Sequence, residues 1–141
     1  MSQKNRNEWL WTENIPKPDA KNFMLACIQD YVVKMYDNDK TDLVKVIGEK
    51  VLSVYPDHIE SFSNIAIAYF IEKDFDKALE YLFKAEKLAP KDVVVLNNIA
   101  WAYAQKKESK KAIDYYEKVI KYGDEDAKEY ANKQILDLKN K

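Results

Sequence analysis

Apolar and polar positions follow a helical period along most of this chain. One apolar face is spaced by three, one and three residues and consists of Phe62, Ile65, Ala66 and Tyr69. Spacing of this kind places side chains on one face of an α-helix. After a polar break at 72–74, a second face holds Ala78, Leu79, Leu82, Ala85 and Leu88. Pro90 ends it, because proline inside a helix loses a hydrogen bond and its ring clashes with the preceding turn. The pattern predicts a helix–turn–helix.

The same pattern returns after 34 residues. Pro56 falls on Pro90, and the stretch Asn64–Tyr69 falls on Asn98–Tyr103. A second helix–turn–helix is therefore predicted over 93–122, with its break at 106–108 and its end near Gly123. A fixed period of this length is typical of stacked units, each too small to bury its own apolar face.

Weaker copies of the pattern flank these two. An earlier one predicts helices over 25–35 and 43–54, with a turn at 37–40 and Asp19 as the N-cap of the first helix. A last amphipathic helix is predicted over 127–140, apolar on one side and charged on the other. Such a helix lets the end of a repeat array face water.

Residues 1–18 have no helical period but contain Trp9 and Trp11. Disordered tails are poor in aromatic residues, so we expect packing of these tryptophans to order part of the segment. The predicted organisation is an aromatic-containing N-terminal segment (1–18) followed by a repeat domain (19–141). The repeats cover about 25–58, 59–92 and 93–126, and the capping helix covers 127–140.

The chain resembles the tetratricopeptide-repeat family. Repeat 59–92 matches the family pattern of small and large residues at Phe62, Ala66, Tyr69, Phe75, Ala78, Ala85 and Pro90. Repeat 93–126 matches it at Leu96, Ala100, Tyr103, Ala112 and Val119. It departs at Ser109, where an aromatic residue is usual, and at Asp124, where proline is usual. Repeat 25–58 is the weakest.

The resemblance implies an all-α fold, a right-handed α-solenoid of antiparallel helix pairs whose first helices line a concave groove. The groove positions of this chain are Val33, Tyr36, Ile67, Phe70, Asn97, Trp101 and Gln105. Five of them form an apolar row: Val33, Tyr36, Ile67, Phe70 and Trp101. Trp101 is the expected anchor, and Asn97 and Gln105 lie one helical turn to either side of it. A contiguous apolar row is typical of a binding surface. The other interpretation is that these side chains only pack between adjacent helices.

One mode of binding in this family uses basic side chains to grip the terminal carboxylate of chaperones. The residues here at the basic positions are Gln29, Val94 and Asn98, none of which is charged. Of the two asparagine positions, Asn64 fits and Val33 does not. Without cations a carboxylate lacks charge-assisted partners, so we do not expect this mode.

Charge and composition narrow the function further. The net charge is −1, with both signs interspersed, so neither nucleic acid nor a membrane surface is an expected partner. Cys27 and His58 are the only residues of their types, which excludes an internal disulfide and a multi-cysteine zinc site. They lie at different ends of the first repeat, too far apart for a catalytic pair, and no glycine-rich phosphate loop is present. We therefore expect no enzymatic activity, no metal and no cofactor.

Two functional hypotheses remain. The first is a non-enzymatic protein–protein interaction module that binds a peptide or helix of a partner in the apolar groove. The alternative is a structural self-assembly module, a homodimer for example, in which Trp9 and Trp11 fill the groove of the same or a neighbouring chain. We expect a cytoplasmic location, because the N-terminus lacks a signal-like apolar stretch. A trimmed secreted or envelope protein stays open.

Overall fold

The computed structural model describes residues 11–12, 15–16, 18–37 and 40–141. The chain divides into two compact units, an N-terminal unit (Met1–Asp39) and a repeat unit (Lys40–Lys141). The sequence placed the domain boundary after residue 18, and that boundary stays a prediction. No helix in the described part of the chain is long and apolar enough to cross a lipid bilayer.

The described residues of the N-terminal unit form two short strands and one helix. Strands β1 (Trp11–Thr12) and β2 (Ile15–Pro16) pair antiparallel, with Trp11 opposite Pro16. The sequence did not predict them, and Trp9 lies outside the described residues. Helix α2 (Pro18–Asp37) begins at a proline, whose fixed φ and missing N–H suit the first turn of a helix. Asp19 is therefore inside that turn, and its prediction as the N-cap is wrong.

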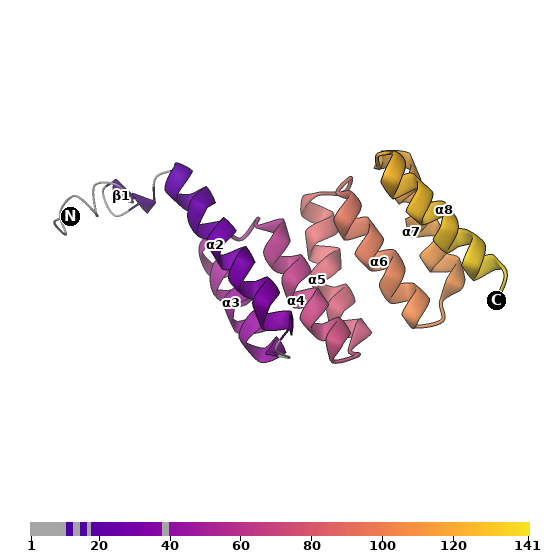
Figure 1. Cartoon of the computed structure of the whole chain (residues 1–141), viewed down its shortest axis with the longest axis horizontal. Coiled ribbons are helices and arrows are strands. Elements are labelled where there is room, and N and C mark those ends of the chain that lie inside the picture. Colours follow the sequence, from indigo (N-terminus) through magenta and orange to yellow (C-terminus); the bar gives the residue numbers. More distant parts are fainter. Residues whose placement is uncertain (1–10, 13–14, 17, 38–39) are drawn as a thin grey trace. The chain divides into compact units, whose positions relative to one another are not determined.

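The repeat unit is an all-α helical-repeat solenoid, and Figure 1 shows its helices following one another in sequence order. They are α3 (Thr41–Val54), α4 (Ile59–Ile71), α5 (Phe75–Leu88), α6 (Val93–Gln105), α7 (Ser109–Tyr122) and α8 (Glu125–Lys139). Each helix packs on the next one along the chain. The predicted breaks at 72–74 and 106–108 are confirmed. In both turns a lysine, Lys73 or Lys107, adopts the left-handed conformation that often ends a helix, with φ of 62° and 64°.

Two apolar clusters form the core of the repeat unit. The first joins α4, α5 and α6 and contains Phe62, Ala66, Ala78, Leu79, Leu82, Ala85, Val95, Ile99 and Ala102. The second joins α6, α7 and α8 and contains Leu96, Ala100, Ala112, Tyr116, Val119 and Ala131. The alanines at the family's small positions are fully buried, which lets neighbouring helices approach closely. Helix α6 contributes to both clusters.

Aspartates begin three of these helices. Asp74, Asp92 and Asp124 each accept a hydrogen bond from a backbone N–H of the first turn, at 3.2, 3.1 and 2.9 Å. Asp124 stands where the repeat pattern usually has proline. Its side chain accepts from the Ala127 N–H and so caps α8. The departure from the pattern thus has a structural role at the end of the array.

Asp124→Ala is expected to destabilise the repeat unit by about 1 kcal/mol, because it removes an N-cap hydrogen bond. Urea denaturation followed by circular dichroism measures this. Asp126→Ala is the matched control, since Asp126 carries the same charge in the first turn of α8 without being the N-cap. It should cost less, about 0.3–1 kcal/mol from the helix dipole. Equal losses in the two variants would contradict the capping role of Asp124.

Candidate functional site

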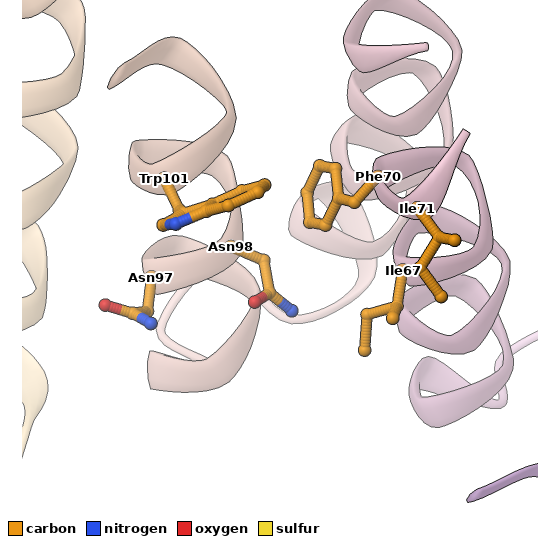
Figure 2. Close-up of a pocket in the computed structure, with 6 residues that line it drawn as sticks. All are labelled: Ile67, Phe70, Ile71, Asn97, Asn98 and Trp101. Atoms are coloured by element: carbon orange, nitrogen blue, oxygen red, sulfur yellow. The ribbon is translucent and has the colours of Figure 1, made fainter. Parts of the chain in front are cut away.

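An open pocket of about 370 Å³ lies between α4 and α6. Figure 2 shows the side chains that line it, three from each helix. They are Ile67, Phe70, Ile71, Asn97, Asn98 and Trp101. Both helices are the first helices of their repeats, so the pocket lies on the face for which the family resemblance predicted a groove.

Helical periodicity explains why these side chains meet. On each helix the lining residues follow steps of one and three positions, which places them on one face. The opposite faces of the same helices are buried in the core, where Ile65 and Ile99 are fully covered. The repeat period then aligns Ile67 with Trp101 on the remaining face. The pocket is therefore lined by the faces of α4 and α6 that are not buried in the core.

Three aromatic rings pack against one another at the pocket, and two of them, those of Phe70 and Trp101, line it. The ring of Trp101 lies 4.8 Å from that of Phe70 and 5.9 Å from that of Phe75, measured between centroids. The two phenylalanine rings are 6.1 Å apart. Tilted and edge-on contacts at these distances are favourable. Trp101 is therefore held in place by its neighbours before any ligand arrives, which lowers the ordering cost of binding.

Two asparagines supply the polar part of the lining. The Nδ2 atom of Asn98 and the Oδ1 atom of Asn97 are buried and have no hydrogen-bond partner among the described residues. In Figure 2 the side chain of Asn98 points across the pocket toward Ile67, whereas the carboxamide of Asn97 turns away from α4. The carboxamide of Asn98 therefore lies on the α4 side of α6, and its Nδ2 atom is covered by neighbouring atoms.

Within the described part of the chain, no residue that lines the pocket is charged. The nearest carboxylate in sequence is Glu72, which directly follows Ile71. It accepts hydrogen bonds from Lys45 Nζ at 2.8 and 2.9 Å and from the Thr41 hydroxyl at 2.8 Å. The hydrogen bond from Lys45, and then that from Thr41, lowers the pKa of Glu72. These bonds hold the carboxylate against α3, so the pocket itself is electrically neutral.

The predicted site residues divide into three groups. Ile67, Phe70, Asn97 and Trp101 come together in the pocket, while Gln105 is exposed at the end of α6 and does not line it. Val33 is exposed on α2, in the N-terminal unit. The side chain of Tyr36 lies outside the described residues. A binding role for any of them stays a prediction.

Ile71 and Asn98 line the pocket but were absent from the predicted set. Ile71 follows Phe70 and is 42% exposed. The family's groove positions include that of Ile71, so the sequence held a signal for it. Asn98 carried no such signal, because it was considered only as a missing basic residue. What marks it is its unpaired buried atom, which depends on the packing of α6.

Comparison with known proteins supports the fold. The family model described as "Tetratricopeptide repeat" matches residues 57–122. The first TPR of Spaghetti (RPAP3), solved bound to the HSP90 peptide SRMEEVD, is similar with a TM-score of 0.67 and 20% identity; the match covers 80% of this chain and 91% of that one. The Sgt2 TPR domain from Aspergillus fumigatus has a TM-score of 0.70 and 20% identity, over 89% of this chain and 80% of that one. No curated protein sequence matches the chain. Residues 57–122 are therefore similar to tetratricopeptide repeats, and the chain shares its fold with these two domains.

Proposed function

We propose that this protein is a non-enzymatic interaction module that binds a peptide or helix of a partner protein at the pocket between α4 and α6. Trp101 and Phe70 are the anchors, and Ile67 and Ile71 complete the apolar wall. The observation that carries the proposal is this open, neutral pocket with a preformed aromatic wall. Aromatic side chains held in this way dominate the energy of many protein interfaces.

The free energy gained by burying the apolar side chains of the pocket is sufficient for micromolar affinity. Burying an apolar side chain contributes about 1.5–3 kcal/mol, so three or four give roughly 5–10 kcal/mol before ordering costs. Micromolar binding requires about 8 kcal/mol. The pocket therefore fits a short segment of a partner rather than a large rigid interface.

A similar domain holds the HSP90 peptide SRMEEVD. That peptide contains several carboxylates, and the pocket described here offers no cation to pair with them. We therefore propose a partner segment with apolar side chains in place of an acidic one. Val33, Tyr36 and Gln105 remain predicted contacts of a partner. Self-assembly through Trp9 and Trp11 also remains a prediction, as does the cytoplasmic location.

Trp101→Ala is expected to weaken partner binding by more than tenfold while leaving the helical content unchanged. Linear twelve-residue peptides selected from a random displayed library on the full chain serve as probes, and calorimetry measures their affinity. Leu136→Ala is the matched control, because it removes an exposed apolar side chain on α8, away from the pocket. SRMEEVD is the acidic probe and should not bind. Equal affinity of the selected peptides for the parent chain and the Trp101 variant would remove the proposal.

A further inference from the structure

We infer that one side of helix α3 binds an amphipathic helix of a partner protein, a helix that carries a carboxylate among its apolar residues. The residues of this side are Leu43, Val46, Lys50 and Val54, and we call them the α3 face. It is a different surface from the pocket between α4 and α6. The inference therefore goes beyond the proposed function and does not depend on it.

The apolar side chains of the α3 face are open to solvent. Leu43, Val46 and Val54 are 46%, 51% and 63% exposed. From Leu43 the four residues follow steps of three, four and four positions, which places them on one side of the helix. Single exposed apolar residues are ordinary on a protein surface, whereas several on one helix face form a patch of the kind that binds another protein.

The later second helices of the repeats, α5 and α7, carry charges at two of these positions. A shift of 34 residues places Leu43 on Lys77 and Val46 on Glu80, and both positions are charged again in α7. Lys77 and Glu80 form an ion pair of 3.7 Å on the surface of α5. The packing of a repeat therefore does not require apolar side chains at these positions. Contact with a partner is a reason for α3 to have them.

Contacts between the second helices show what usually lies against this side. On α7, Lys118 Nζ lies 3.5 Å from Glu86 Oε2 of α5, and the Tyr115 hydroxyl donates to Glu86 Oε1 at 3.1 Å. On α5, the Tyr81 hydroxyl donates to Glu49 of α3. Each of these helices thus places the same side against a carboxylate of the second helix before it.

Helix α3 is the first second helix, and no second helix precedes it in the repeat unit (Figure 1). Lys50 stands two repeat periods before Lys118, and it forms no ion pair with a carboxylate of the described residues. A partner helix at this position would cover Leu43, Val46 and Val54, and its carboxylate would pair with Lys50, as Glu86 pairs with Lys118. The arrangement would continue the interface between α5 and α7.

A second copy of the chain fits the α3 face less well. Lys50 lies near the middle of the face, between Val46 and Val54. In a symmetric pair of α3 helices the same surface faces itself, so the two Lys50 side chains would come together. Like charges brought together oppose association. A carboxylate in this place favours it, which is why we assign the face to an acidic amphipathic helix.

The test uses a displayed library of single alanine-based helices, randomised on one face and selected on the full chain. Selected helices are made as stapled peptides and titrated by calorimetry against the parent chain, Lys50→Glu, and the double variant Leu43→Lys with Val46→Glu. The double variant carries charges of the kind that α5 tolerates at these positions. Leu136→Lys is the matched control, because it places a charge at an exposed apolar position of α8. Helices that lose affinity with Trp101→Ala bind the pocket and are set aside.

We expect the remaining helices to share an aspartate or glutamate on the randomised face. Lys50→Glu and the double variant should each lower their affinity at least tenfold, and Leu136→Lys should leave it unchanged. Replacing the acidic residue of the helix by lysine should restore affinity for Lys50→Glu, since the two changes reverse one ion pair. This restoration also shows that Lys50→Glu is folded, so the test does not rest on the double variant.

The inference is overturned if no selected helix depends on the α3 face, or if the acidic residue can be replaced by alanine without loss. Light scattering of the parent chain tests the second copy, because a dimer that the double variant abolishes would make the chain itself the partner. A tenfold gain in affinity on changing Trp9 and Trp11 to serine would assign the face to the N-terminal segment instead. Either result overturns the inference. The peptides that depend on Trp101 test the proposed function separately, so the two can fail independently.

Discussion

Gly48→Leu should destabilise the repeat unit by roughly 3 kcal/mol or more, because there is no room for a side chain at this crossing of α3 and α4. A Cβ atom on Gly48 would lie 2.5 Å from Cγ1 and 2.8 Å from Cδ1 of Ile65, and 3.5 Å from the Ser61 carbonyl oxygen. Ile65 is fully buried, so its side chain has little freedom to move away. A leucine would force the two helices apart.

The repeat pattern alone would favour the opposite result. Gly48 stands 34 residues before Leu82, which is fully buried at the equivalent position of the next repeat. An alignment of the repeats would therefore identify leucine as the best residue at 48. The structure shows that Ile65 already fills this space from α4. Glycine is therefore favoured at position 48 because of how α3 packs on α4, and not because of the repeat pattern.

Gly48→Ala separates the two effects that act at this position. Alanine in a helix interior is favoured over glycine by about 1 kcal/mol, whereas overpacking a core costs about 1–3 kcal/mol. We expect the second effect to prevail, with a net loss of about 1 kcal/mol in the free energy of unfolding measured in urea. Removing the clashing atoms with Ile65→Ala should make a double variant less destabilised than the sum of the single ones. A Gly48→Ala protein that is more stable than the parent would show that helix propensity governs this site.

The helices of the repeat unit could be predicted because their evidence is periodic and repeated. Apolar spacing placed the breaks at 72–74 and 106–108, and the structure has turns at both. The structure differs from the sequence prediction where a single contact determines the local conformation. Asp19 resembles an N-cap in isolation, but Pro18 begins the helix before it. The close approach of Ile65 to Gly48 occurs only between α3 and α4, so the repeat period does not predict it.

The candidate site also contains residues that the sequence could predict and residues that it could not. Ile67, Phe70 and Trp101 could be placed on one surface because repeat register and helical spacing fix their direction. Gln105 shares that spacing, yet α6 ends at this residue, so it is exposed beyond the pocket. Asn98 was missed for a different reason. Periodicity predicts which face a residue occupies, whereas an unpaired buried atom is known only once its surroundings are packed.

Tyr116→Ala is expected to cost roughly 3–5 kcal/mol of folding free energy, as truncation of a large buried side chain does. Tyr116 is the largest fully buried side chain of the repeat unit and belongs to the cluster that joins α6, α7 and α8. Its ring lies 6.4 Å from that of Tyr130 on α8, between centroids. Its removal leaves a cavity between the last helices of the array.

Tyr115→Ala is the matched control, because it removes the same side chain from the adjacent position of α7. Tyr115 is only partly buried; its hydroxyl donates to Glu86 Oε1 at 3.1 Å, and Lys118 Nζ lies 4.1 Å from the ring centroid. Losing these contacts should cost about 1–2 kcal/mol. Urea denaturation of both variants measures the difference, and equal losses would mean that burial does not set the cost in this helix.

Hydrogen exchange can then show where the damage from Tyr116→Ala is confined. The stability of a repeat array is close to a sum of repeat and nearest-neighbour terms. Amides of α7 and α8 should therefore lose protection before those of α4 and α5, whose core is the other cluster. Helix α6 belongs to both clusters and carries Trp101. The protection of its amides therefore shows whether this wall of the pocket stays folded in the variant. Protection that falls equally in α4 and α8 would mean that the repeat unit unfolds as one block, and that changes at its end reach the pocket directly.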